Sequence, residues 1–125
     1  MGFFDGLMGN SSELDLASVE KENKEILTEN ERVEKAYKVI RDTFIFTDKR
    51  LILIDKQGVT GKKTEYLSIP YKSIISFSIE TAGTFDLDAE LKIWMSGVAV
   101  PLQKKFNKST NIYELQRVLA KYILK

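Results

Sequence analysis

Three carboxylates with strand-like spacing are the side chains best placed for chemistry. Asp86, Asp88 and Glu90 occupy every second position of the run DLDAEL. Successive side chains of a strand point to opposite faces, so a strand here puts all three acids on one face. That face could bind a hard cation through oxygen ligands, or two acids could share a proton in acid-base catalysis. Both functions need further groups converging from elsewhere, so we predict a polar contact surface and no metal site.

The residues after these acids extend the same face. Lys92 and Trp94 keep the parity of the acids, while Ile93 and Met95 keep the apolar parity. Tryptophan is enriched where proteins meet, although strand twist or the N-terminal segment could instead bury the ring inside its own domain. The candidate interaction surface consists of Asp86, Asp88, Glu90, Lys92 and Trp94.

A glycine- and lysine-rich stretch, GVTGKK at 58–63, invites comparison with a nucleotide-binding loop. A P-loop has four residues between its glycines, a hydroxyl residue after its lysine, and then a helix. Here only two residues separate Gly58 from Gly61, Lys63 replaces the hydroxyl, and a strand pattern follows. We predict a turn that uses glycine for positive φ.

Composition excludes several classes of function. The chain has no histidine and no cysteine, which removes the commonest metal ligand and general base as well as the thiolate nucleophile. Its formal net charge is +1, and its basic residues, Arg50 among them, are scattered over turns and strand ends. This pattern predicts solvated cations and no nucleic-acid binding. We expect no enzymatic activity, no cofactor and no metal.

The elements that position these residues are predominantly strands. A chain of 125 residues is most simply one domain. From Val33 to about Phe106, short runs rich in β-formers alternate with turn residues. Ile75, Phe77 and Ile79 share one strand face, which we expect to be buried. The seven expected strands are VEKAYKVI, TFIFT, RLILID, KTEYLSI, IISFSIE, AELKIWM and VAVPLQKKF, a number typical of a barrel or sandwich.

One of these strands is apolar on both faces. Positions 51–54 read LILI without alternation, so both faces should be covered, either by the rest of the chain or by another subunit. Ile52 and Ile54 are therefore candidate oligomer contacts.

Helical patterns flank the strands. We expect a helical extension over 1–30, a β-barrel over 31–107 and a helix over 109–125, in which Asn111 or Thr110 caps an amphipathic stripe. The start MGFFDGLMGN lacks a basic region and the roughly 20 apolar residues of a membrane span, so a cytoplasmic location is expected. Its apolar side chains are candidate oligomer or membrane contacts: Phe3, Phe4, Leu7 and Met8.

Three separated motifs carry a family resemblance. FTDKRLILID, QGVTGKKTEYLSIPYKSI and ETAGTFDLDAELKIW, in this order, resemble the bacterial pleckstrin-homology-like (PH-like) domain family and, more distantly, the PH and GRAM superfamily. The resemblance spans nearly the whole chain. It implies a bent seven-stranded barrel or sandwich with a C-terminal capping helix, with 48–50 and 58–61 as turns between strands.

The resemblance also bears on function. It implies closed cyclic homo-oligomers, typically pentamers, with a hydrophilic surface thought to contact other proteins, and it implies no enzyme. Lipid-binding PH domains grip inositol phosphates with a long basic loop between their first two strands, whereas that connection here is only about Arg41 to Thr43. We predict a ring-forming module for an unidentified protein partner. A membrane-surface module using the apolar N-terminus is the alternative, and an enzyme relying on the acidic face comes third.

Overall fold

The computed structural model describes residues 14–39, 42–57, 63–81, 89–106 and 112–124. The chain divides into two compact units, Met1–Ile69 and Pro70–Lys125, and each is described by itself. The candidate residues 3, 4, 7, 8, 86 and 88 lie outside the described residues, as do both turn glycines and the expected caps of the C-terminal helix.

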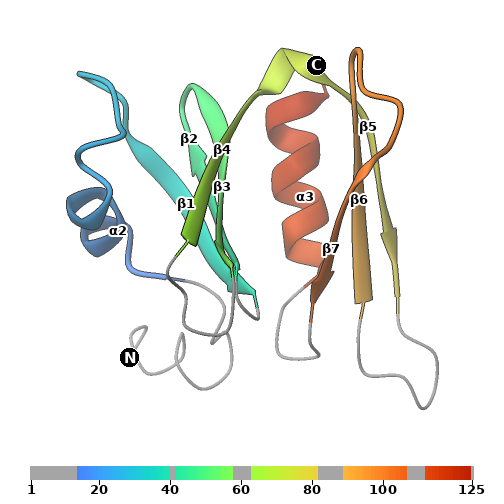
Figure 1. Cartoon of the computed structure of the whole chain (residues 1–125), viewed down its shortest axis with the longest axis horizontal. Coiled ribbons are helices and arrows are strands. Elements are labelled where there is room, and N and C mark those ends of the chain that lie inside the picture. Colours follow the sequence, from blue (N-terminus) through green and yellow to red (C-terminus); the bar gives the residue numbers. More distant parts are fainter. Residues whose placement is uncertain (1–13, 40–41, 58–62, 82–88, 107–111, 125) are drawn as a thin grey trace. The chain divides into compact units, whose positions relative to one another are not determined.

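The first unit is an antiparallel sheet with a short helix beside it (Figure 1). The helix α2 spans Leu16–Glu22 and contacts β1, and the strands follow one another in the order β1-β2-β3-β4. Their bounds are Val33–Val39 for β1, Asp42–Thr47 for β2, Arg50–Gln57 for β3 and Lys63–Pro70 for β4. The expected hairpin between the second and third strands is confirmed, because Phe46 pairs with Leu51 across the turn.

Within the described residues, the N-terminal helical segment ends at Glu22 and does not continue to residue 30 as predicted. The side-chain amide of Asn23 donates to the carbonyl oxygen of Val19 at 2.8 Å and caps the last turn of α2. The residues that follow form turns, in which Asn30 has a φ of 69°. Asparagine tolerates this left-handed conformation better than most residues. Local side-chain hydrogen bonds and tertiary contacts thus outweigh the helix propensity of the residues after Asn23.

The doubly apolar strand is covered by the chain itself. All four residues of 51–54 are buried in β3. Ile52 and Ile54 pack with Val19 and Ile45 in one apolar cluster of the first unit, on which Leu16 and Ile26 also lie. The prediction that Ile52 and Ile54 contact another subunit is therefore wrong for this fold, because their side chains belong to the interior of one chain.

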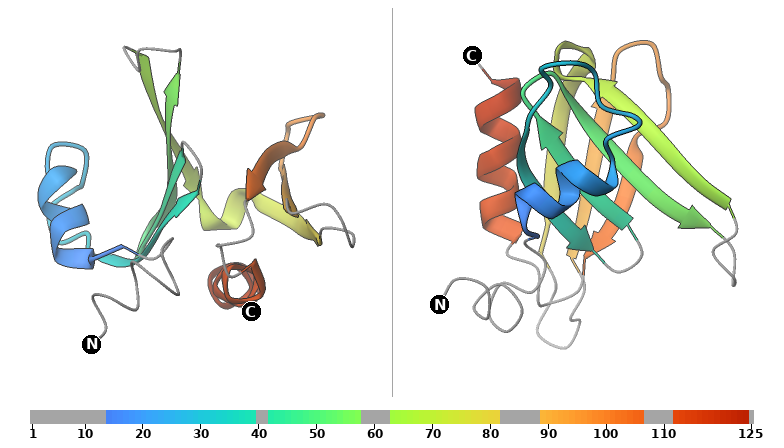
Figure 2. Two further views of the ribbon diagram at one scale, coloured as in Figure 1. Left: turned by 90° about the horizontal axis from the view of Figure 1, so that it is seen from below. Right: turned by 90° about the vertical axis from the view of Figure 1, so that its left-hand side faces the viewer.

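The second unit holds the remaining three described strands and the C-terminal helix (Figures 1 and 2). A 3₁₀ turn, η1 (Tyr71–Ser73), leads into an antiparallel sheet of order β5-β6-β7. The strand bounds are Ile74–Glu80 for β5, Ala89–Met95 for β6 and Leu102–Phe106 for β7. The last strand begins later than predicted, since Val98 and Val100 belong to the β6–β7 turn and Pro101 precedes the strand.

The C-terminal helix α3 spans Ile112–Ile123 and contacts β5 and η1. Its buried residues follow the predicted stripe at helical spacing. They are Ile112, Leu115, Val118 and Leu119.

Seven described strands in two antiparallel sheets, followed by a C-terminal helix, confirm the predicted fold class. No helix within the described ranges is long and apolar enough to span a membrane.

Candidate functional site

The second sheet presents a face of alternating polar side chains, which we call the polar face. The register sets Ser78 opposite Lys92 and Lys92 opposite Gln103, so these side chains form a row across β5, β6 and β7. The face consists of Ser76, Ser78, Glu80, Glu90, Lys92, Trp94, Gln103 and Lys105. Leu91 and Ile93, which alternate with these residues along β6, are fully buried. The structure thus places Glu90, Lys92 and Trp94 on one face.

Two glutamates stand directly opposite each other on this face. Glu80 at the end of β5 pairs with Glu90 at the start of β6. Like charges directly opposite on a sheet are destabilising. Lys105 lies across from Glu90 on β7, and Lys92 follows it two residues along the strand, so cations flank the acidic pair. The polar face therefore mixes both signs of charge over a short distance.

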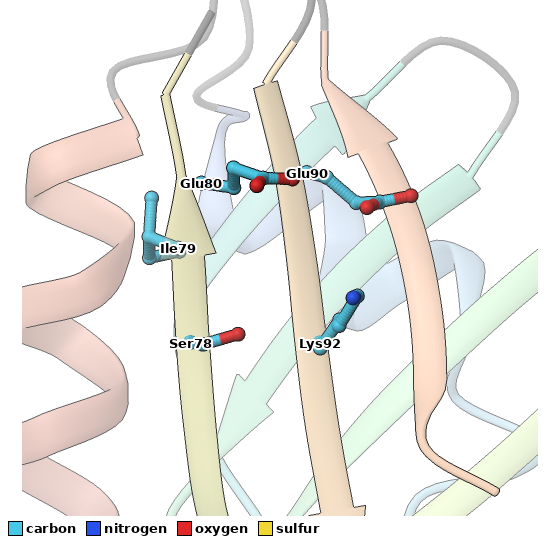
Figure 3. A pocket seen from close by; sticks show the side chains of 5 residues that line it. All are labelled: Ser78, Ile79, Glu80, Glu90 and Lys92. Atoms are coloured by element: carbon cyan, nitrogen blue, oxygen red, sulfur yellow. The ribbon is translucent and has the colours of Figure 1, made fainter.

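A shallow hollow of about 240 Å³ lies over the two glutamates. It is lined by Ser78, Ile79, Glu80, Glu90 and Lys92 (Figure 3). The ring of Trp94 is half-buried further along the same face. Within the described residues, no three acidic side chains gather closely enough to hold a metal ion.

A buried ion pair in the first unit was missed by sequence reasoning. Glu31 is 4% exposed, and its carboxylate accepts two hydrogen bonds from the Arg50 guanidinium, at 2.9 Å from Nε and 3.0 Å from Nη2. The Thr47 hydroxyl donates to the same carboxylate at 2.6 Å, and the Thr28 backbone N–H donates at 3.0 Å. The prediction of Arg50 as a solvated surface cation is therefore wrong.

The same guanidinium joins two further segments. It donates from Nη2 to the carbonyl oxygen of Ile26 at 2.6 Å and from Nη1 to the Ser68 hydroxyl at 2.8 Å. Arg50 thus connects the segment after α2, the β2–β3 turn and strand β4. Two other residues of the TDKR stretch at 47–50 accept backbone hydrogen bonds: the Thr47 hydroxyl accepts the backbone N–H of Arg50 at 2.9 Å, and the Asp48 carboxylate accepts that of Arg32 at 3.0 Å.

A second carboxylate holds the start of β1. Glu20 on α2 accepts the backbone N–H of Val33 at 2.8 Å and the Arg32 Nε at 3.1 Å. The hydrogen bond from Val33, with that from Arg32, lowers the pKa of Glu20.

The stability of the protein should fall in acid through Glu31. Desolvation by itself would raise its pKa, but hydrogen bonds from Arg50, Thr47 and Thr28 outweigh it and lower the pKa from 4.5 to about 2. A lowered folded-state pKa stabilises fully above the unfolded value, and this stabilisation is lost as the pH falls through the folded value. Unfolding in urea at pH 7, 4.5, 3 and 2 should show a loss of at most about 3 kcal/mol from this group, concentrated between about pH 4.5 and 2.

Glu31→Gln is the control for this pH dependence. Its stability should vary less with pH in that window, while the remaining slope reports Glu20 and the other acids. A wild type and a Glu31→Gln variant with the same pH dependence would contradict the assignment.

Two antiparallel sheets followed by a C-terminal helix define a PH-like domain of the type expected from the motifs. The family model described as "Bacterial PH domain" matches residues 2–123. The chain belongs to the bacterial PH domain family.

Relatives and solved structures agree with this membership. The uncharacterized protein YjqA of Bacillus subtilis (strain 168) is 62% identical over 121 residues, which cover 96% of this chain and 97% of YjqA. YozO of the same organism is 38% identical over 82% of this chain and 88% of its own length. The crystal structure of a pleckstrin homology domain from Shewanella amazonensis SB2B is similar with a TM-score of 0.87 and 56% identity, covering 98% of this chain and 99% of that one.

Proposed function

We propose that this chain is a non-enzymatic interaction module that assembles into a closed ring of identical subunits and presents the polar face to another protein. The observation that carries the proposal is the position of strand β4, which ends the strand order of the first sheet.

Strand β4 has the properties of a subunit contact. It ends the order β1-β2-β3-β4, and five of its eight residues are exposed. The Tyr66 side chain at its centre is 52% exposed. An edge strand presents unpaired backbone groups that another strand can satisfy. A head-to-tail contact through such an edge forms a ring if its rotation closes, which agrees with the assembly that the family resemblance implies.

The polar face suits a protein partner. Its charges of both signs give a partner complementary positions, and its half-buried tryptophan offers an aromatic anchor. The pairing of Glu80 with Glu90 costs stability in the free protein, and a cation from a partner placed between them would relieve it.

Replacing Tyr66 by lysine should break the ring. A lysine on an edge strand discourages pairing with another strand because its charge would be brought against the joining chain. Light scattering after size exclusion should give the wild type a mass several times the 14.3 kDa of one chain, and Tyr66→Lys a mass near 14.3 kDa.

Tyr113→Lys is the matched control, because this tyrosine is 60% exposed and belongs to helix α3 instead of a strand. It should assemble as the wild type does. A folded wild type that is monomeric at micromolar concentration would overturn the ring, and equal loss of assembly in both variants would remove β4 as its contact.

A membrane contact through Phe3, Phe4, Leu7 and Met8 remains the alternative expected from sequence. These residues lie outside the described part of the chain. No contact or exposure in the structure therefore favours that alternative over the ring.

A further inference from the structure

A β-bulge in the second unit makes one large aliphatic side chain point toward solvent. Ile74 pairs with Met95 and Ser76 pairs with Trp94, so Ile75 is an extra residue in β5. Bulges re-aim side chains in this way. Ile75 is 66% exposed, and the prediction that it shares a buried face with Phe77 and Ile79 is wrong because the bulge breaks the alternation.

The neighbouring β6–β7 turn is also apolar. Turn tips usually carry glycine, proline, asparagine, aspartate or serine. Here Gly97 supplies a φ of 80°, but Val98 and Val100 follow it with 49% and 73% of their surface exposed. The Ser96 backbone N–H donates to the carbonyl oxygen of Ser73 at 2.8 Å, which holds this turn against η1.

The C-terminal end of α3 completes this end of the second unit. The Tyr122 ring stacks on Tyr71 of η1 with 4.9 Å between centroids. Figures 1 and 2 show η1, the β6–β7 turn and the last turn of α3 at the same end of the unit. We call this the turn end: η1 and the start of β5 (71–75), residues 94–101, and residues 121–124.

The charges of the turn end have one sign. Lys72 and Lys121 are exposed. Among the described residues that form the turn end there is no aspartate and no glutamate. The glutamates of the polar face, Glu80 and Glu90, pair at the opposite end of strands β5 and β6.

We infer that the turn end docks on an anionic lipid bilayer. Exposed aliphatic tips can enter the boundary between head groups and acyl chains, and tyrosine and tryptophan favour that boundary because one part of each ring system is polar. Lysines beside the tips are attracted to anionic head groups. A bilayer also needs no matching pattern of opposite charges, which fits a surface whose described charges are all positive.

The turn end shares Trp94 with the polar face, but none of its other residues belongs to the polar face or to strand β4. It also contains none of the N-terminal residues Phe3, Phe4, Leu7 and Met8. The inference therefore stands or falls independently of the ring.

The fluorescence of the chain's single tryptophan can report docking on vesicles. Trp94 lies at the turn end and is half-buried, so docking should bring it close to lipid. Vesicles of phosphatidylcholine with 30% phosphatidylglycerol, some with brominated acyl chains, are added to the protein. We expect brominated vesicles to quench Trp94 emission, and vesicles of phosphatidylcholine alone or 0.5 M salt to weaken binding, because screening reduces the attraction of the lysines.

Val98→Asp combined with Val100→Asp should lower the vesicle partition coefficient at least about tenfold, because carboxylates are costly at the lipid boundary and are repelled by anionic head groups. Both positions are exposed in a turn, so folding should persist, as circular dichroism and the urea midpoint can verify. Tyr113→Asp, at an exposed tyrosine in the first turn of α3 and so at the other end of that helix from residues 121–124, is the matched control and should leave partitioning unchanged.

A third variant, Phe3→Ser with Phe4→Ser, tests the N-terminus and should retain at least half of the quenching. Three results would overturn the inference: no binding of the wild type to anionic vesicles, equal binding by the double aspartate variant, or loss of binding only in the double serine variant. If the aspartates abolish self-association while the wild type ignores vesicles, the turn end is a contact between copies instead.

Discussion

Arg50→Ala should destabilise the protein by about 3–5 kcal/mol, the largest effect we expect of any single substitution. The side chain of Glu31 is fully buried, and that of Arg50 is 23% exposed. Removal of the guanidinium leaves the carboxylate buried without its counter-charge and leaves the carbonyl of Ile26 without this donor. The measurement is urea unfolding followed by circular dichroism at pH 7, where a lower midpoint with an unchanged m-value reports a loss of stability.

The neighbouring Lys49→Ala is the matched control. Lys49 is exposed in the β2–β3 turn, so its removal should change stability by no more than about 0.5 kcal/mol. In a second control, Arg50→Met with Glu31→Leu should be more stable than Arg50→Ala, since no charge is then left unpaired. Arg50→Ala and Lys49→Ala with the same midpoint would refute the role assigned to the pair.

Leu119→Ala should cost about 2–5 kcal/mol, because it deletes a fully buried side chain and leaves a cavity that its surroundings fill only in part. Leu119 lies on the buried stripe of α3, the helix that contacts β5 and η1. Gln116→Ala, at an exposed position of the same helix, should change stability little and controls for helix propensity. An unchanged urea midpoint in Leu119→Ala would show that α3 contributes little to the cooperative unit.

The strands were predictable because their signals are local. A period of two, interrupted by turn residues, located all seven described strands, and the turn at 48–50 was expected between the second and third of them. The apolar run 51–54 predicted that both faces of its strand are buried, but not what buries them. It requires cover on both faces, but its residues do not reveal whether that cover comes from the same chain.

The features that were missed depend on distant residues or on a change of register. Glu31 and Arg50 are 19 residues apart and belong to no shared periodic pattern, so their pairing emerges only from tertiary structure. The bulge at Ile75 is likewise invisible in an alternating sequence, because one extra residue reverses the parity of all residues before it. Part of the candidate surface, Glu90, Lys92 and Trp94, follows simple strand alternation and was placed on one face from sequence.

The hydrogen bonds of the Arg50 side chain also restrict which substitutions this chain can accept during evolution. One guanidinium uses its planar fork on both oxygens of Glu31 and also bonds Ile26 and Ser68, a geometry that the single ammonium of lysine cannot reproduce. If a substitution removes only Glu31 or only Arg50, the charge of the remaining residue is left without its partner. Positions 31 and 50 should therefore change together among homologous sequences, whereas position 49, which is exposed in the β2–β3 turn, should vary independently of them.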